Sequence, residues 1–306
     1  MIYDVIILGA GPAGLSAAIY AKRAMLNALI IDRNYIGGGQ IINTYEVDNY
    51  PGLPGISGFD LGEKMSDHAD KFGVEKISAE ISSIDLSSKI KTVYTDNGNF
   101  ESKSIIIATG NSPKKLSVPG EDEFAGMGVS YCATCDGAFF KGKTTAVVGG
   151  GDVAVEDAIF LSRGCEKVYL IHRRDELRGA KSLQDELFKT DNIEVIFDSV
   201  VTSINGSDSV ESISVKNLKS DSIDLLNVNG VFLAVGNDPN TIAISNAKAN
   251  LETDSKGYIK ACEDCKTNIP GVFAAGDIRT KKLRQVVTAV ADGANAIESL
   301  QEYLRL

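Results

Sequence analysis

Residues 4–14 read Asp4-Val5-Ile6-Ile7-Leu8-Gly9-Ala10-Gly11-Pro12-Ala13-Gly14, a short apolar run that passes directly into a glycine motif. Residues 15–23 then have the pattern of a helix, and a second apolar run ends at Asp32. Glycines at this spacing let the backbone turn tightly from strand to helix and approach a pyrophosphate, which the free N–H groups of the helix start bind. The pattern predicts a dinucleotide site formed by Gly9, Gly11, Pro12, Ala13, Gly14, Asp32 and Arg33.

The same pattern returns in the middle of the chain. Residues 145–148 are apolar, Gly149-Gly150-Gly151-Asp152-Val153-Ala154 follows, and a helix through about Arg163 leads to a strand over 167–171 that ends at His172. The distance from the first glycine to the end of the second strand is 23 residues in both units, 9 to 32 and 149 to 172. A tight strand-to-helix turn without a ligand explains one or two glycines but not the matched spacing. We therefore expect an α/β protein with two Rossmann-like, three-layer dinucleotide-binding domains.

Loop-like segments indicate how the two domains are connected. Three further apolar strands end in glycine, at 104–110, 230–236 and 271–277, and loop-like segments rich in Pro, Asn and Gly occupy 111–123 and 237–247. These crossover points suggest that one domain is inserted into the other. We expect a discontinuous first domain at 1–115 and 242–306 and an inserted second domain at 116–241.

The residues at the two strand ends indicate which nucleotide each site prefers. Asp32 can accept hydrogen bonds from ribose hydroxyls and would repel a 2′-phosphate, so the first site favours FAD or NAD. The second unit has arginines at the matching place, and guanidinium groups bind phosphate in a bidentate manner, which favours NADPH. A solvated basic helix start is the alternative. The predicted NADPH residues are Gly149, Gly151, Asp152, Ala154, His172, Arg173, Arg174, Arg178 and Gly236.

A second acidic motif supports FAD at the first site. Gly276-Asp277 follows an apolar strand and precedes an amphipathic helix expected over 284–303. Asp277 can bind hydroxyls of the ribityl chain or hydroxyls on the phosphate side, and the helix start at Arg284, Gln285 and Val286 would favour negative charge on a reduced flavin. An aspartate that only caps the helix is the alternative.

Composition excludes some classes of protein. The 306 residues are 43% hydrophobic and 24% charged, which is ordinary for a globular protein of two domains. The formal net charge of −10 disfavours nucleic-acid binding, which depends on lysine and arginine. No signal-peptide pattern opens the chain, and its apolar runs are too short for a membrane helix. We expect a cytoplasmic protein that binds neither nucleic acid nor membranes.

Two C-x-x-C pairs, Cys132/Cys135 and Cys262/Cys265, can be redox pairs or metal ligands. A shared zinc site is disfavoured, because structural zinc pairs usually lie about 15–20 residues apart in sequence. Cys262 and Cys265 can be ordinary thiols or a second redox pair, and Cys165 is expected to pack in the core. We expect no metal site.

The motifs resemble one family, the low-molecular-weight thioredoxin reductases of bacteria. The match spans most of the chain, in the family's order, and its most specific part is Cys132-Ala133-Thr134-Cys135-Asp136-Gly137 ahead of the second glycine motif. The remaining matches are residues 9–14, 38–40, 46–52, 108–110, 149–152, 172–175, 271–277 and 284–285. The segment around Cys262 and Cys265 departs from the family pattern. The resemblance adds Gly39, Gln40, Asn49, Ala108, Thr109, Gly110 and Gly276 to the expected FAD residues.

The resemblance also implies an activity. It implies a homodimer with non-covalent FAD, NADPH as the donor, and thioredoxin or a thioredoxin-like protein as the partner. In this reading Cys135 faces the flavin, Cys132 attacks the partner's disulfide, and Asp136 is the acid that protonates the leaving thiolate. A related reductase with another partner or with ferredoxin as donor, and a redox sensor without turnover, are the alternatives. The arginines at 173, 174 and 178 argue against the ferredoxin variant.

Overall fold

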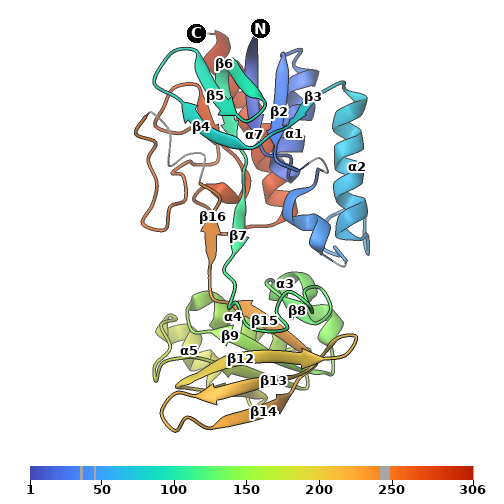
Figure 1. Ribbon diagram of the computed structural model, residues 1–306, viewed down its shortest axis with the longest axis vertical. Helices are drawn as coiled ribbons and strands as arrows, with labels where there is room; N and C mark the ends of the chain where they lie inside the picture. Colours follow the sequence, from blue (N-terminus) through green and yellow to red (C-terminus); the bar gives the residue numbers. More distant parts are fainter. Residues whose placement is uncertain (35–36, 45, 242–248, 306) are drawn as a thin grey trace. The chain divides into compact units, whose positions relative to one another are not determined.

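The computed structural model describes residues 1–34, 37–44, 46–241 and 249–305, which form two compact units (Figure 1). The first unit comprises Met1–Ser112 and Asp238–Leu306, and the second is Pro113–Asn237. The sequence placed the breaks after residues 115 and 241. Residues 242–248, where the second segment of the first domain was expected to begin, lie outside the described residues. The connecting segments β7 (Asn111–Pro113) and β16 (Asn237–Pro239) pair as a two-stranded sheet.

The first unit is built on a seven-stranded sheet of order β3-β2-β1-β6-β5-β4, with β17 paired to β6. Strands β1, β2, β3, β6 and β17 are parallel, while β4 and β5 add antiparallel ladders at one edge. The strand bounds are β1 (Ile2–Leu8), β2 (Ala28–Asp32), β3 (Glu75–Ser78), β4 (Ile81–Asp85), β5 (Lys91–Thr95), β6 (Gly98–Ile107) and β17 (Val272–Ala274).

Both faces of this sheet are covered. Side chains alternate along a strand, so Val5 and Ile7 pack with the helices while Ile6 and Leu8 pack in a separate core on the other face. The helices are α1 (Pro12–Arg23), α2 (Gly58–Lys71), α7 (Val286–Arg305) and the 3-10 turns η1 (Gly39–Asn43) and η3 (Gly276–Ile278). Helices α1 and α7 approach closely, because a Cβ on Gly293 of α7 would lie 2.2 Å from the Ala13 carbonyl oxygen.

The second unit contains a five-stranded parallel sheet of order β11-β10-β9-β15-β8. Its strands are nearly continuous apolar runs, as expected of a parallel sheet buried on both faces. The bounds are β8 (Val129–Ser130), β9 (Thr144–Gly149), β10 (Lys167–Ile171), β11 (Ile193–Ile196) and β15 (Gly230–Ala234).

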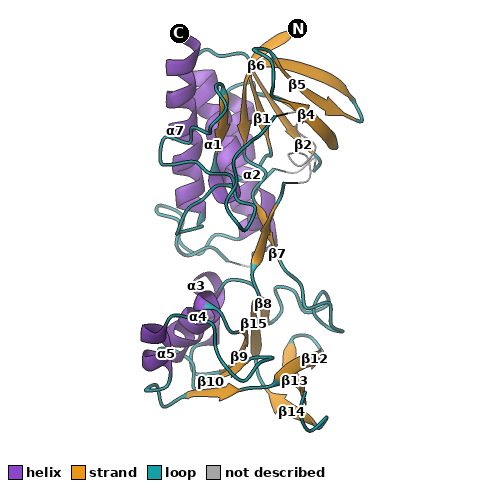
Figure 2. Cartoon of the chain, turned by 90° about the vertical axis from the view of Figure 1, so that its left-hand side faces the viewer, coloured by secondary structure: helices purple, strands orange, loops and turns teal. Residues whose placement is uncertain are grey.

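Helices cover one face of this sheet and a small antiparallel sheet covers the other (Figure 2). The helical layer consists of α3 (Ala133–Asp136), η2 (Gly137–Phe140), α4 (Asp152–Ser162) and α5 (Lys181–Leu187). The antiparallel layer is β12 (Ser199–Gly206), β13 (Val210–Asn217) and β14 (Ile223–Asn227). The second unit thus has three layers, and its three-stranded antiparallel layer is the part that the sequence did not predict. No helix in the described part of the chain is long and apolar enough to cross a membrane.

Candidate active site

The first glycine loop combines two sterically required glycines with one that faces free space. A Cβ on Gly9 would lie 2.5 Å from the Ala108 carbonyl oxygen, and one on Gly14 would lie 1.9 Å from the Gly9 carbonyl oxygen. A Cβ on Gly11 would meet no atom closer than 3.9 Å. The first and third glycines are therefore needed by the fold. The middle one leaves room at the start of α1, where a pyrophosphate would approach.

The second glycine loop repeats this arrangement. A Cβ on Gly149 would lie 2.5 Å from the Ala234 carbonyl oxygen, and one on Gly150 would lie 2.2 Å from Nδ1 of His172. No atom lies within 4 Å of the position that a Cβ on Gly151 would take. Free space again opens at the start of a helix, here α4.

Several expected FAD residues meet at the start of α1. A Cβ on Gly39 would lie 3.1 Å from the Cα of Gly11, and one on Gly276 would lie 2.9 Å from the Cβ of Ala13. The Asp32 carboxylate is fixed at the end of β2, because its oxygens accept hydrogen bonds from the N–H groups of Ala10 at 2.6 Å and Asn34 at 2.7 Å. Each oxygen retains lone-pair capacity for a ribose hydroxyl.

The other expected FAD residues form links of their own within the first unit. The Gln40 amide donates to the side-chain oxygen of Asn111 at 3.0 Å, and Asn49 donates to Oε1 of Gln285 at 3.0 Å. Thr109 donates to the Asn240 carbonyl oxygen at 2.9 Å. Gly110 follows with a left-handed backbone, Arg33 is exposed beyond β2, and Val286 is the first residue of α7.

The Asp277 carboxyl fits a ligand with a hydrogen-bond donor. Its Oδ1 is buried and has no hydrogen-bond partner among the described residues, and burial raises the pKa of its carboxyl against the opposing charges of Lys281 and Arg284. An unsatisfied buried oxygen is costly unless a ligand group bonds to it. The Arg284 guanidinium lies nearby over the Tyr258 ring, 4.2 Å from its centroid.

The loop that carries Arg173, Arg174 and Arg178 is hydrogen-bonded to the glycine loop of the second unit. The Arg178 N–H donates to the Gly150 carbonyl oxygen at 2.6 Å, and Oδ1 of Asp152 accepts the Ala180 N–H at 2.7 Å. The side chains of Arg173, Arg174 and Arg178 are exposed, and the described part of the chain shows no ion pair for any of them. They are therefore available to a phosphate.

His172 directly follows β10, and its ring lies against Gly150 of the glycine loop. Burial, with the charges of Arg178 and Arg174, lowers the pKa of its ring, so the ring is held neutral. Its Nε2 is buried and has no partner among the described residues. Ala154 is buried in the first turn of α4, and the left-handed Gly236 follows β15 and accepts the Lys114 N–H at 2.9 Å.

Cys132 and Cys135 form a disulfide, with their Cα atoms 5.3 Å apart. Cys132 is the N-cap of the short helix α3, and Cys135 lies within that helix. Both side chains are half-buried, and Sγ of Cys132 lies 3.4 Å from Oγ1 of Thr134. As a disulfide the two sulfurs are not thiolate ligands for a metal.

Asp136 directly follows the disulfide and has an unusual environment. The Ser130 hydroxyl donates to its Oδ2 at 2.6 Å, and the same hydroxyl oxygen accepts the Cys132 N–H at 3.1 Å. The other oxygen, Oδ1, is buried without a partner in the described residues. Burial raises the pKa of the Asp136 carboxyl, although the Ser130 hydrogen bond opposes this. The group is thus suited to hold a proton beside the sulfurs.

A buried carboxylate that the sequence analysis missed anchors the residue before Cys132. Oε1 of Glu121 accepts the Tyr131 hydroxyl at 2.8 Å, and its Oε2 accepts the Ser117 N–H at 2.6 Å. Burial and the Glu121 charge raise the pKa of Tyr131, so the phenol remains protonated and continues to donate. Only the folded chain brings Glu121 and Tyr131 together, so no local pattern indicates the pair.

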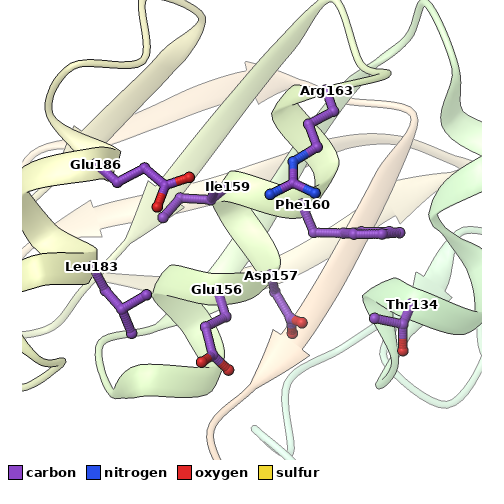
Figure 3. Close-up of a pocket in the computed structure, with 8 residues that line it drawn as sticks. All are labelled: Thr134, Glu156, Asp157, Ile159, Phe160, Arg163, Leu183 and Glu186. Carbon is purple, nitrogen blue, oxygen red and sulfur yellow. The ribbon is translucent and has the colours of Figure 1, made fainter.

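A groove beside the disulfide was also missed (Figure 3). Thr134, one of the two residues between the cysteines, lies across from α4, and the Asp157 and Phe160 side chains are on its side of the groove. Burial and the neighbouring Glu156 charge raise the pKa of Asp157 to about 7. The full lining is Thr134, Glu156, Asp157, Ile159, Phe160, Arg163, Leu183 and Glu186.

The remaining cysteines are free thiols. Cys165 is buried in the core of the second unit, as expected. Cys265 is buried and donates to the Asp292 carbonyl oxygen at 3.4 Å, and burial raises the pKa of its thiol to about 12, whereas Cys262 is exposed. Cys265 is therefore a packing residue. Within the described ranges, no group of three or more His, Cys, Asp or Glu side chains is placed to hold a metal ion.

The known proteins that this chain resembles are of the kind that the two glycine loops and the disulfide indicate. Residues 3–293 match the family described as pyridine nucleotide-disulphide oxidoreductase. The chain belongs to this family. A thioredoxin reductase of Listeria innocua is 46% identical over 304 residues, covering 99% of this chain and 94% of that protein. A thioredoxin reductase of Peptoclostridium litorale is 43% identical over 310 residues, covering 99% and 97%.

Solved structures of this family agree as well. The crystal structure of thioredoxin reductase from Streptococcus pyogenes is 44% identical, covers 99% of this chain and 98% of its own, and has a TM-score of 0.93. The thioredoxin reductase of Giardia duodenalis is 36% identical with a TM-score of 0.92, and each chain is covered to 99%. These relatives confirm the resemblance drawn from the motifs and the predicted class of two Rossmann-like domains.

Substitution at the second glycine loop should separate ligand binding from folding. Gly151→Ala should weaken NADPH binding by about tenfold or more, equivalent to about 1.4 kcal/mol, because the new methyl group enters the space left for phosphate. The melting temperature without NADPH should fall only slightly, because nothing lies within 4 Å of the added Cβ, although alanine is a poorer N-cap of α4 than glycine. Isothermal titration and thermal unfolding measure the two effects.

Two matched variants control this measurement. Gly150→Ala should lower the melting temperature, because its Cβ would meet the His172 ring, whereas Gly164→Ala, also in open space, should change neither quantity. An unaltered NADPH affinity in Gly151→Ala would remove this loop from the binding site.

The environment of Asp136 predicts a pH dependence of stability. Its raised pKa means that the folded state binds the proton more tightly than the unfolded chain does. This contribution to stability is complete below the ordinary carboxyl pKa of about 3.9 and is lost as pH rises through the raised folded value. Asp136→Asn stays neutral, so it should melt above the wild type at about pH 8, and the difference should shrink toward about pH 4.

Thermal unfolding across this pH range provides the measurement. Asp191→Asn removes an exposed carboxylate from the same unit and controls for the general loss of one charge. A difference between Asp136→Asn and wild type that does not vary with pH would contradict the buried, proton-binding state of Asp136.

Proposed function

We propose that the chain is an NADPH-dependent flavoprotein that reduces the disulfide of thioredoxin or a thioredoxin-like protein through Cys132 and Cys135. The observation that carries this proposal is the Cys132–Cys135 disulfide, which the buried carboxyl of Asp136 follows directly in sequence and to which the Ser130 hydroxyl links it through the Cys132 N–H. This group lies in the unit whose glycine loop is accompanied by three exposed arginines. A redox sensor without turnover would not need a proton-binding group next to the sulfurs.

The first unit has the groups that FAD requires. The start of α1 beyond Gly11 offers space and N–H groups to the pyrophosphate, Asp32 offers oxygens to a ribose, and Asp277 has a buried oxygen that needs a donor. Asp32 and Asp277 suit hydroxyl donors, which FAD has on both its ribose and its ribityl chain. When bound there, FAD supplies the relay of two electrons between a nicotinamide and a disulfide.

The second unit has the groups that distinguish NADPH. The space beyond Gly151 and the start of α4 suit its pyrophosphate, while Arg173, Arg174 and Arg178 suit the 2′-phosphate that NADH lacks. Asp152 orients this loop through its hydrogen bond to Ala180. A donor without a 2′-phosphate would leave the three guanidinium groups without a ligand.

The chain's own residues then carry out the exchange with the partner. Once the disulfide is reduced, the Cys132 thiolate attacks one sulfur of the partner's disulfide, which forms a mixed disulfide and releases the partner's other sulfur as a thiolate. The Cys135 sulfur next displaces the second partner sulfur and restores the Cys132–Cys135 bond. Asp136, protonated over a wider pH range than a free carboxyl, supplies a proton to a leaving thiolate.

The resemblance further implies a homodimer with non-covalent FAD in the cytoplasm. Both the assembly and the location stay predictions.

A single substitution tests the proposed route of electrons. Cys135→Ser should leave reduction of the flavin by NADPH intact and abolish NADPH-dependent reduction of thioredoxin, because no disulfide can then form within the chain. Anaerobic bleaching of the flavin absorbance measures the first effect, and formation of thioredoxin thiols measures the second.

The exposed thiol provides a matched control, since Cys262→Ser should leave both quantities unchanged. Unchanged thioredoxin reduction by Cys135→Ser would exclude Cys135 from the mechanism. Normal bleaching in the wild type without reduction of any thioredoxin-fold protein would indicate a different partner class.

A further inference from the structure

Asp292 is a buried carboxylate within helix α7 that accepts four hydrogen bonds from three residues. Its Oδ2 accepts the Gly276 N–H at 2.8 Å, Nε of Arg279 at 2.8 Å and Nζ of Lys281 at 2.8 Å. Its Oδ1 accepts Nη2 of Arg279 at 2.6 Å. Nearby cations and these hydrogen bonds lower the pKa of Asp292 despite its burial, so the group is ionised.

Arg279 is as deeply buried as its partner. The exposed fraction of its side chain is 2% and that of Asp292 is 3%, and the guanidinium also donates to the carbonyl oxygens of Ala261 at 3.3 Å and Thr280 at 3.1 Å. Buried ion pairs gain little net stability, because removing two charges from water offsets most of their attraction. A role in fixing geometry accounts for the pair better than stability does.

The geometry that Asp292 fixes is the turn that follows β17. Gly276 has a left-handed backbone with φ of 78°, and a Cβ there would lie 2.9 Å from the Cβ of Ala13 in the first glycine motif. A Cβ on Gly293, next to Asp292, would lie still closer to Ala13, 2.2 Å from its carbonyl oxygen. Asp292 thus ties η3 to α7 at the place where both contact the start of α1.

This turn carries the unsatisfied acid. Asp277 directly follows Gly276, and its Oδ1 is the buried oxygen without a partner in the described residues. Asp292 accepts the hydrogen bond of the Gly276 N–H, so the orientation of the Gly276–Asp277 segment depends on Asp292. Asp292 itself is not among the residues expected to contact FAD.

We propose that Asp292, together with Arg279, is a positioning residue for the FAD of the first unit. Asp292 holds the Gly276–Asp277 turn so that the free oxygen of Asp277 meets a ligand hydroxyl at the start of α1. This inference rests on the proposed FAD site, and it assigns the orientation of the Gly276–Asp277 turn to a buried ion pair between Asp292 of α7 and Arg279, which follows η3.

The test compares FAD affinity with local backbone protection. Asp292→Asn keeps the shape but loses the charge, and it should weaken FAD binding by about tenfold to a hundredfold, the loss that removal of a hydrogen-bond partner of a metal ligand causes in metal sites. Release of flavin from the holoprotein on dilution, followed by its fluorescence, gives the affinity. Amide exchange in residues 275–281 should accelerate, while exchange in the second unit should not.

Two further variants keep the test independent of folding. Ser299→Ala removes another buried hydrogen bond of α7, to the Asp264 carbonyl oxygen, and should lower the melting temperature without changing FAD affinity. Arg279→Lys keeps the charge but loses the two-point contact, so it should weaken FAD binding less than Asp292→Asn does.

Three results would count against the inference. Unchanged FAD affinity in both Asp292→Asn and Arg279→Lys overturns it and leaves the proposed function intact. Weakened affinity in Ser299→Ala to the same degree overturns it too, because general loss of stability would then explain the effect. A wild-type chain that binds no FAD overturns the proposed function and this inference together.

Discussion

Close approach of backbone to backbone at the two glycine loops is the constraint on which both units depend. Gly9 and Gly14 in one loop, and Gly149 in the other, would each place a Cβ within 2.5 Å of a carbonyl oxygen. At these glycines the strand–helix turn can therefore pack directly on neighbouring backbone, because no Cβ atom stands between the two. The same loops leave Gly11 and Gly151 facing open space, so the tight packing and the space for phosphate come from one arrangement.

The chemistry is carried by groups that are individually costly to bury. Asp136 and Asp277 each keep a buried oxygen without a partner among the described residues, and His172 keeps a buried nitrogen in the same state. Such atoms cost free energy in a protein that binds nothing. Their positions, beside the disulfide, at the end of β17 and at the end of β10, are the three places where the proposed activity requires a proton or a ligand.

Sequence patterns identified the motifs that lie within short segments and missed the contacts between residues that only the fold brings together. The glycine motifs, Asp32, the arginines after β10 and the disulfide pair lie in short segments whose spacing reflects their chemistry. Glu121 and Tyr131 could not be matched, because their contact depends on a loop that no periodicity describes. Asp292 left a faint signal as an acid on the apolar face of α7, but its partner Arg279 lies on another segment. The antiparallel layer of the second unit was missed because its strands are rich in serine, asparagine and charged residues and lack the long apolar runs of the parallel strands.

Whether electrons from NADPH reach the Cys132–Cys135 disulfide within this chain is tested most directly by anaerobic titration of the holoprotein with NADPH. The disulfide and the flavin each take two electrons, so the wild type should oxidise about two NADPH per chain. A variant with both cysteines changed to serine should oxidise about one. Oxidation of the same amount of NADPH by both proteins would contradict electron transfer to the disulfide, because the disulfide would then accept no electrons from NADPH.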